Sequence, residues 1–179
     1  MKKLFIVRHA QADAYGSAAS DFERPLSPFG VADAQRMARL VACELAIGQA
    51  GSLEIFSCSP ALRTRQTAAL FLEVWGRSAD ELKAFEHGYA TTTAAWLDHI
   101  QGWDNAAEHG WIWGHNPELS MLASELSGTD GVGGSAVQLS PADIICLQFE
   151  IDDWGAVFSA SGTPTLHLVA SQQRTHLRP

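Results

Sequence analysis

Leu4-Phe5-Ile6-Val7-Arg8-His9 places a continuous apolar run directly before a cation and an imidazole. A short, continuous apolar run is typical of a buried strand, so we predict a strand over Lys3 to Val7. The small and polar residues from Ala12 to Ser20 predict a loop after it. Because α/β sheets bind ligands at the carboxyl ends of their strands, Arg8 and His9 stand where a ligand site is expected.

In two further segments, a predicted strand is followed by the start of a helix. Leu53 to Phe56 predicts a second strand, and Ser59-Pro60 is typical of the first turn of a helix that runs to about Trp75. Gly110 to Trp113 predicts a third strand, and Asn116-Pro117 begins another helix. The three strands therefore bring Arg8, His9, Arg63 and Gly114-His115 toward one edge of a sheet.

The rest of the chain predicts the outer layers of the fold. Ser27-Pro28 begins a helix that we expect to end between Gly48 and Gly51, and Thr91 to Ile100 is weakly helical. The pattern over 81–89 leaves helix and strand open. Glycines within Ser127 to Ser140 predict a surface loop.

The C-terminal part contains two further apolar runs. We predict strands over Ile144 to Ile151 and Trp154 to Ala160, paired as a hairpin that turns near Asp152-Asp153. Strands interleaved with helices indicate a three-layer α/β/α sandwich with a mostly parallel central sheet, to which this hairpin adds an antiparallel edge. The length is typical of one domain, so we expect residues 1–179 to form a single domain.

Composition narrows the class of protein. The net charge of −8 argues against nonspecific binding to nucleic acid or to an anionic membrane, which needs a broad basic face. Lys2 and Lys3 precede an apolar run too short for a signal peptide or a membrane helix, so we expect a cytoplasmic protein. Cys43, Cys58 and Cys146 are too widely separated for a close-pair metal site and are interpreted as reduced thiols. The sequence does not indicate an oligomeric state.

The charged residues of the quoted segments predict a phosphate pocket. Arg8, Arg24 and Arg63 are three of only nine arginines, and helix starts add amide groups that bind anions. Neighbouring positive charge disfavours imidazolium, so His9 is expected to be neutral and able to attack phosphorus. The arginines and His115 would stabilise the charge on the transferred group, and this chemistry requires no metal or cofactor.

These residues resemble the histidine phosphatase superfamily, also called the phosphoglycerate-mutase-like family. The resemblance rests on Arg8-His9, on the Ser57, Arg63 and Thr67 spacing and on Gly114-His115, which occur in order over most of the chain. The short length, Asp21-x-x-Arg24-Pro25-Leu26-x-x-x-Gly30 and His115-Asn116-Pro117 look like the SixA type of protein phosphohistidine phosphatase. The resemblance implies a phosphoglycerate-mutase-like fold and a phosphohydrolase that acts on phosphohistidine, for example on a phosphotransfer protein.

The resemblance also implies roles for single residues. His9 is the residue phosphorylated, and the phosphate is held by Arg8, Arg24, Arg63, His115 and Asn116. Glu86 stands in the region where many family members carry the acid that protonates the leaving group, and Asp21 is its rival. A phosphohistidine substrate needs little help from such an acid, because its imidazole leaves as a neutral group once its free nitrogen is protonated. Ala10 replaces the family's usual glycine, and a positive φ at this position would be strained.

Three alternatives stay open at this point. The first is a small-molecule phosphomonoesterase or a phosphoglycerate-mutase-like enzyme of the same family. The second is a module that binds phosphate or a phosphoprotein without turnover, which would need the arginines but not the nucleophile. A metal site is the third and is disfavoured, because no close pair of histidines occurs and arginines beside His9 would repel a cation.

Overall fold

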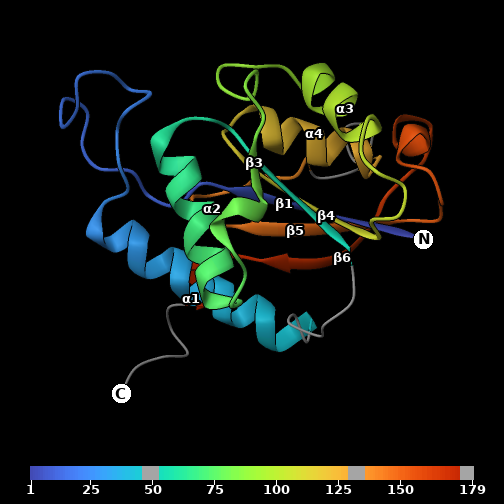
Figure 1. Cartoon of the computed structure of the whole chain (residues 1–179), viewed down its shortest axis with the longest axis horizontal. Helices are drawn as coiled ribbons and strands as arrows, with labels where there is room; N and C mark the ends of the chain where they lie inside the picture. Colours follow the sequence, from blue (N-terminus) through green and yellow to red (C-terminus); the bar gives the residue numbers. More distant parts are fainter. Residues whose placement is uncertain (46–52, 129–135, 174–179) are drawn as a thin grey trace.

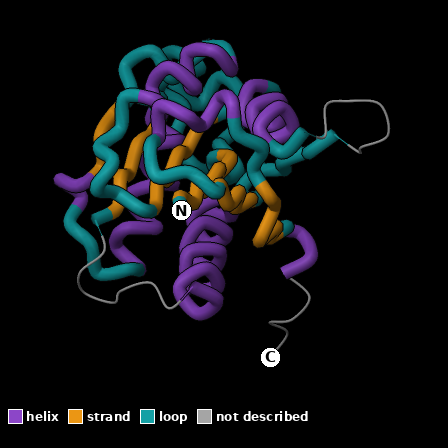
Figure 2. Tube along the Cα trace, turned by 90° about the vertical axis from the view of Figure 1, so that its right-hand side faces the viewer, coloured by secondary structure: helices purple, strands orange, loops and turns teal. Residues whose placement is uncertain are grey.

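The computed structural model describes residues 1–45, 53–128 and 136–173. A central sheet lies between two layers of helices (Figure 1). Figure 2, turned by 90°, shows helices above and below the strands. This is the α/β/α sandwich predicted from the sequence, so the fold prediction is confirmed.

Within the described part of the chain, the sheet contains six strands in the order β3-β2-β4-β1-β5-β6. Their bounds are Lys2–Arg8 for β1, Glu54–Cys58 for β2, Leu82–Ala84 for β3, His109–Gly114 for β4, Ile144–Phe149 for β5 and Thr163–Leu168 for β6. The pairs β1–β4, β2–β4 and β2–β3 are parallel, and β1–β5 and β5–β6 are antiparallel. The parallel strands β1, β2 and β4 therefore end at one edge, where Arg8 lies opposite Gly114.

Helices cover both faces of this sheet. Their bounds are Pro28–Leu45 for α1, Leu62–Val74 for α2, Thr93–Gln101 for α3, Glu118–Leu126 for α4 and Ala170–Gln173 for α5, with short 3₁₀ helices η1 at Ala79–Glu81 and η2 at Trp154–Ser159. The end of α1 predicted at 48–51 lies outside the described residues.

Successive side chains of β1 point to opposite faces of the sheet, and the core therefore has two parts. Phe5 and Val7 pack with buried residues of α1 and α2, whereas Leu4 and Ile6 pack with those of α3, α4 and η2. The apolar run at the start of the chain is therefore a central strand buried on both faces, as its continuous apolar character predicts. Trp111 and Trp113 of β4 are fully buried and belong to the same part of the core as Phe5 and Val7.

One predicted strand is wrong. Residues 154–159 form η2, and the strand that pairs with β5 is β6, which follows it. Asp153 accepts a hydrogen bond from the amide of Gly155 and caps this turn. Trp154 and Val157 are both buried, and their spacing of three suits a 3₁₀ helix rather than a strand. The hairpin at the antiparallel edge exists, but it uses the more exposed and less apolar segment.

Within the described residues, no helix is both long enough and apolar enough to cross a membrane.

Candidate active site

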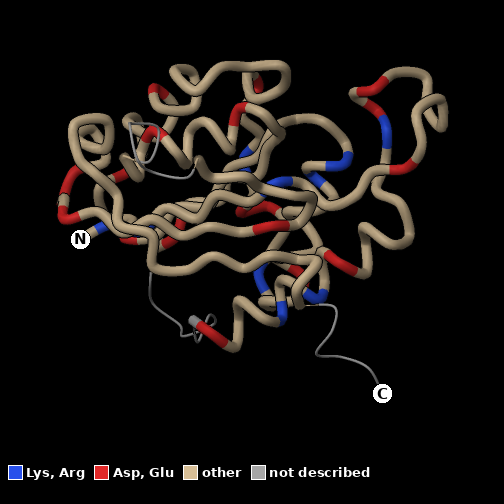
Figure 3. Tube along the Cα trace, turned by 180° about the vertical axis from the view of Figure 1, so that it is seen from behind, with Lys and Arg blue, Asp and Glu red and all other residues tan. Residues whose placement is uncertain are grey.

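An open cavity of ≈ 320 Å³ lies at the carboxyl ends of β1 and β4 and the start of α2. Its wall brings together residues far apart in the chain: Arg8, His9, Tyr15, Asp21, Arg24, Arg63, Tyr89, Ala90, His115, Asn116 and Glu118. Every candidate site residue from the sequence except Glu86 lines this cavity. In Figure 3, several of the few positively charged residues lie near the base of the long loop between β1 and α1.

The ring of His9 is held in one tautomer by its neighbours. Its Nδ1 lies 2.7 Å from the carbonyl oxygen of Ala10, and because a carbonyl only accepts, Nδ1 carries the proton. The Nε2 atom accepts a hydrogen bond from Nε of Arg63 at 3.3 Å. The neutral ring therefore presents a lone pair on Nε2 beside a guanidinium group.

Burial lowers the pKa of His9 to about 4. The hydrogen bond to the Ala10 carbonyl opposes this change, and the charges of Arg63, Arg8 and Arg24 add to it. The sequence indicated a neutral imidazole on the ground of nearby arginines, but removal from water is the larger cause. His9 is uncharged at neutral pH, as a nitrogen nucleophile must be.

Arg63 lies in the first turn of α2 and links the two histidines. Its Nη2 donates to Nδ1 of His115 at 3.4 Å, while its Nε donates to His9. The rings of His9 and His115 are 5.0 Å apart between their centroids. One guanidinium group thus lies beside both imidazoles in the cavity.

His115 follows β4 and is held from behind by hydroxyl groups. Because Nδ1 accepts from Arg63, the proton of the neutral ring is on Nε2, which donates to Oγ of Ser59 at 2.7 Å. Burial lowers the pKa of His115 to about 3, and the neighbouring His9 and Arg63 act in the same direction. A bound phosphoryl group would reverse this bonding pattern, since Ser59 can donate to Nε2 and leave Nδ1–H for a phosphate oxygen.

Arg8 and Asn116 are joined through the segment that precedes β5. Nη1 of Arg8 and Nδ2 of Asn116 both donate to the carbonyl oxygen of Leu139, at 2.8 and 2.7 Å. Burial lowers the pKa of Arg8, and the carboxylate of Asp143 opposes this effect. The side-chain amide of Asn116 is therefore already used to position the chain beside the cavity.

Asp21 joins the two other arginines of the site. Its carboxylate lies 2.8 Å from Nη2 of Arg24 and 3.0 Å from Nη2 of Arg63. It also accepts a hydrogen bond from the hydroxyl of Tyr89 at 2.9 Å. Although burial opposes ionisation, the Tyr89 hydrogen bond and the charges of Arg63 and Arg24 hold the pKa of Asp21 below its usual value. A carboxylate held in its ionised form is a poor proton donor.

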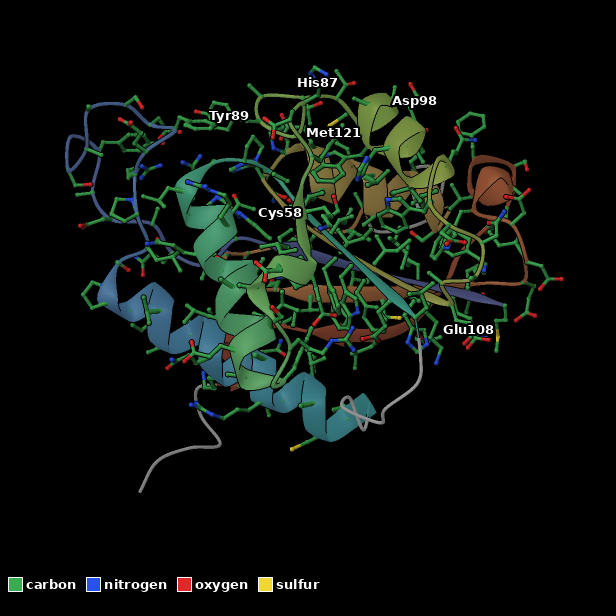
Figure 4. All side chains as sticks on the ribbon, viewed as in Figure 1. Cys58, His87, Tyr89, Asp98, Glu108 and Met121 are labelled. Atoms are coloured by element: carbon green, nitrogen blue, oxygen red, sulfur yellow. The ribbon has the colours of Figure 1, made fainter. Side chains whose placement is uncertain are left out.

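Tyr89 is a cavity residue that sequence reasoning missed. Its ring lies 5.4 Å from that of His115 in an edge-on contact, and Figure 4 shows it pointing toward the loop between β1 and α1, whereas His87 points outward. The sequence around it, Gly88-Tyr89-Ala90, carries no recognisable signal. Only the backbone turn, with Ala90 at φ 49°, reveals the unusual conformation there.

Glu86, the acid that the resemblance implies, lies outside the cavity. Its side chain is exposed, and it does not line the cavity. The short strand β3 ends at Ala84, and the following turn directs Tyr89 rather than Glu86 to the site. The geometry therefore gives no support to Glu86 as the acid.

Two of the helix-start amides are hydrogen-bonded within the protein. The amide of Leu62, in the first turn of α2, donates to the carbonyl oxygen of Phe22 at 3.0 Å, and the amide of Leu119 in α4 donates to His115 at 3.0 Å. These two groups connect the site loops to the helices and are not free for phosphate. The anion-binding donors of the cavity are mainly side chains.

Ala10 and Thr67 connect the backbone next to His9 to α2. Ala10 is fully buried and does not adopt a positive φ, so its methyl group is accommodated without backbone strain, as expected. Its amide donates to Oγ1 of Thr67, which in turn donates to the carbonyl oxygen of Arg63 at 2.7 Å. The spacing of Arg63 and Thr67 therefore couples the backbone at His9 to the first turn of α2.

Gly30 explains a further element of the sequence pattern. A Cβ atom at this position would lie 2.0 Å from the carbonyl oxygen of Gln11. The same carbonyl accepts hydrogen bonds from the amide and hydroxyl of Ser27. The absence of a side chain at Gly30 lets the loop after His9 pack against the start of α1.

The family model of the histidine phosphatase superfamily (branch 1) matches residues 4–112. The chain belongs to this superfamily. The match includes His9 and Arg63 and ends just before His115. No curated protein sequence gives a significant match.

Solved structures of SixA proteins share the fold of this histidine phosphatase. One, assigned as the phosphohistidine phosphatase SixA of Nakamurella multipartitia, is 25% identical, with a TM-score of 0.74 over 93% of this chain and 95% of that one. A SixA protein histidine phosphatase in complex with tungstate is 20% identical, with a TM-score of 0.75 over 95% and 98%. A mycobacterial glucosyl-3-phosphoglycerate phosphatase is 15% identical, with a TM-score of 0.63 over 94% and 100%.

Proposed function

We propose that this single-domain histidine phosphatase is a cytoplasmic, metal-independent phosphohydrolase that removes phosphoryl groups from phosphohistidine in proteins. Membership of the superfamily makes it a phosphatase by family. The observation that carries the proposal is the bonding of His9: Nδ1 is engaged by the Ala10 carbonyl, which leaves a lone pair on Nε2 in a cavity lined by three arginines. A site that only bound phosphate would not need this arrangement.

The first step is transfer of the phosphoryl group to His9. Its Nε2 lone pair attacks phosphorus, the bond from phosphorus to the leaving nitrogen breaks, and the departing imidazole, already protonated on its other nitrogen, leaves as a neutral ring. Arg8, Arg63 and His115 stabilise the charge on the three equatorial oxygens. Arg24 lies farther out, where it contacts the ring of Tyr15 and the Asp21 carboxylate, and it completes the positive wall.

The second step is hydrolysis of the phosphoryl group on His9. The ring then bears phosphorus on Nε2 and a proton on Nδ1, so it is positively charged, and the Ala10 carbonyl stabilises that charge. A positively charged imidazole is a good leaving group. Water attacks phosphorus, the bond to Nε2 breaks, phosphate leaves with both protons of the water, and His9 returns to its neutral form with the proton on Nδ1.

The absence of Glu86 from the cavity fits a nitrogen leaving group. Cleavage of a phosphate ester releases an alkoxide, which needs a positioned acid, whereas an imidazole protonated on its other nitrogen leaves as a neutral group. Asp21 is held ionised and does not supply such an acid. These two observations favour phosphohistidine over an alkyl phosphate.

The decisive experiment is capture of the phosphoryl group on His9. We expect brief incubation with a ³²P-labelled phosphohistidine protein, followed by alkaline denaturation, to leave acid-labile label on the peptide that contains His9. The His9→Ala variant should take up no label. Absence of both label and phosphate release would instead favour a module that binds phosphate without turnover.

A substrate panel separates the remaining alternatives. We expect a phosphorylated phosphotransfer protein and phosphoimidazole to be hydrolysed faster than 3-phosphoglycerate or sugar phosphates. Faster hydrolysis of one of the small esters would support a phosphomonoesterase of the same superfamily.

A further inference from the structure

Glu118 is a second carboxylate in the wall of the cavity. It is the first residue of α4, three residues after His115, and its side chain is half-buried. Among the described residues, its carboxylate has no hydrogen bond or ion pair, and nothing in the mechanism above uses it.

Asp21, the other carboxylate in the wall, differs in its partners. It accepts from Arg24, Arg63 and Tyr89, so its negative charge is compensated within the site. Glu118 faces the same cavity without such compensation. Of the two, Glu118 is therefore the one whose charge is directed at a substrate.

The charge balance of the cavity indicates what that substrate carries. Three arginines stand against two carboxylates, and both histidines are neutral, so the wall has one formal positive charge. A phosphoryl group brings up to two negative charges and more than balances it. Among the residues that the structure describes in this wall, no cation is left for a second anionic group on the substrate.

We propose that Glu118 sets the leaving-group specificity of the cavity: its carboxylate admits a neutral or positively charged group bonded to phosphorus and disfavours a second anion on the substrate. This inference rests on the proposed phosphohydrolase function and deepens it. An imidazole or a nearby lysine of a protein substrate meets attraction from Glu118. A carboxylate or second phosphate on a small metabolite meets repulsion.

The experiment compares three substrates and three variants. Phosphoimidazole has a nitrogen leaving group, p-nitrophenyl phosphate has an uncharged aromatic group, and 3-phosphoglycerate carries a carboxylate. Glu118→Gln and Glu118→Lys change the charge in the cavity wall. Glu125→Lys is the matched control, because it makes the same charge change on α4 two turns away, about 10 Å along the axis, and Glu125 does not line this cavity.

The expected result is a change in preference rather than in overall rate. For Glu118→Lys, the ratio of kcat/KM for 3-phosphoglycerate to kcat/KM for p-nitrophenyl phosphate should rise by about tenfold. The corresponding ratio for phosphoimidazole to p-nitrophenyl phosphate should fall. Glu118→Gln should give a smaller change in the same direction, and Glu125→Lys should leave both ratios within about twofold. If Glu118 only stabilised the start of α4, its replacement would lower the melting temperature without altering these ratios.

Binding provides a readout that does not need turnover. The dissociation constant of 3-phosphoglycerate relative to that of inorganic phosphate should fall in Glu118→Lys by about the same factor, as measured by calorimetry. Equal changes for all ligands, or the same shift in Glu125→Lys, would overturn the role of Glu118. Failure of the proposed function would be seen separately, as the absence of turnover and of labelled His9 in the unmodified protein.

Discussion

The two ends of β4 carry the same kinds of side chain but differ in what those side chains can do. At its carboxyl end His115 lies with Arg63 and Asp21 around an open cavity. At its start His109 lies 3.2 Å from Glu54, which also pairs with Arg77. Arg77 also forms an ion pair with Glu81, four residues further along the chain. Both clusters contain histidine, arginine and carboxylate groups.

The difference lies in the balance of charge and in the room left for a ligand. Around Arg77, two carboxylates share one guanidinium group, and Glu54 is almost fully buried, so the cluster is satisfied internally. Around Arg63, arginines outnumber carboxylates and the side chains surround a cavity. The comparison teaches that residue types alone do not distinguish a structural ion-pair network from a binding site, whereas surplus charge beside open space does.

The sharpest test of this distinction is His9→Ala. Removal of Nε2 eliminates the covalent intermediate, so hydrolysis of phosphoimidazole should fall by at least about 10⁴-fold. The arginines remain, so the affinity for inorganic phosphate should change little. Steady-state kinetics and calorimetry on the same preparation measure both quantities. Activity close to that of the unmodified protein would exclude His9 as the nucleophile.

Arg63→Ala should lower kcat by about 100-fold or more, because a donor that strengthens in the transition state is worth roughly 3 kcal/mol. The matched change at the other end of β4 is Arg77→Ala. It should leave kcat within about twofold but lower the free energy of unfolding by about 1–3 kcal/mol, since buried Glu54 loses its guanidinium partner and keeps only His109. Urea denaturation and kinetics on both variants test the pair. If Arg77→Ala slowed catalysis as strongly as Arg63→Ala, the two clusters would not be functionally distinct.

Acidification should destabilise the protein through the two cavity histidines. Their folded pKa values, about 4 and about 3, lie below the ordinary value of 6.5, so the unfolded chain binds more protons as the pH falls below 6.5. Stability is therefore retained above pH 6.5 and lost below it, down to about pH 4 for His9 and about pH 3 for His115, by up to about 1.4 kcal/mol per pH unit for each histidine. Urea denaturation at several pH values measures the slope.

His9→Ala should make that slope shallower, because one of the two histidines no longer contributes. The control is His87→Ala, since His87 is exposed and lies outside the cavity. It should leave the slope unchanged. An equal slope in all three proteins would mean that the acid sensitivity has another origin.

The sequence predicted the site best where a residue follows directly from a strand. Arg8-His9 and Gly114-His115 end neighbouring parallel strands, so register alone brings them to one edge. Arg63 is placed by the first turn of the next helix, which also follows a strand. Each of these positions depends on local structure, which apolar periodicity and helix-start signals reveal.

The parts that the sequence did not predict depend on contacts between distant loops. Asp21 and Tyr89 are 68 positions apart and meet only because two loops fold over the same sheet edge. Glu86 resembled a family acid by position, but the turn after β3 directs a different side chain inward. The strand predicted over Trp154 to Ala160 was wrong for a similar reason: Trp154 is buried, and its Nε1 donates to the carbonyl oxygen of Ala107 at 3.0 Å, a contact between distant segments that composition does not reveal.

The smallest expected effect belongs to Tyr89→Phe, which tests whether this loop contact matters for catalysis. The change removes one hydrogen bond to Asp21 and keeps the ring beside His115. Asp21 keeps both of its arginine partners when this hydrogen bond is lost, so only part of the energy of the bond should reach the reaction, and kcat/KM should change by about threefold to tenfold. Because Asp21 pairs with both arginines, a released carboxylate competes more strongly with phosphate for them, and the loss should be in KM rather than kcat.

Asp21→Asn in the Tyr89→Phe background separates this competition from a change of packing. It removes the competing charge, so KM should recover if competition is the cause. A KM that stayed high in the double variant would assign the effect of Tyr89 to its packing against His115.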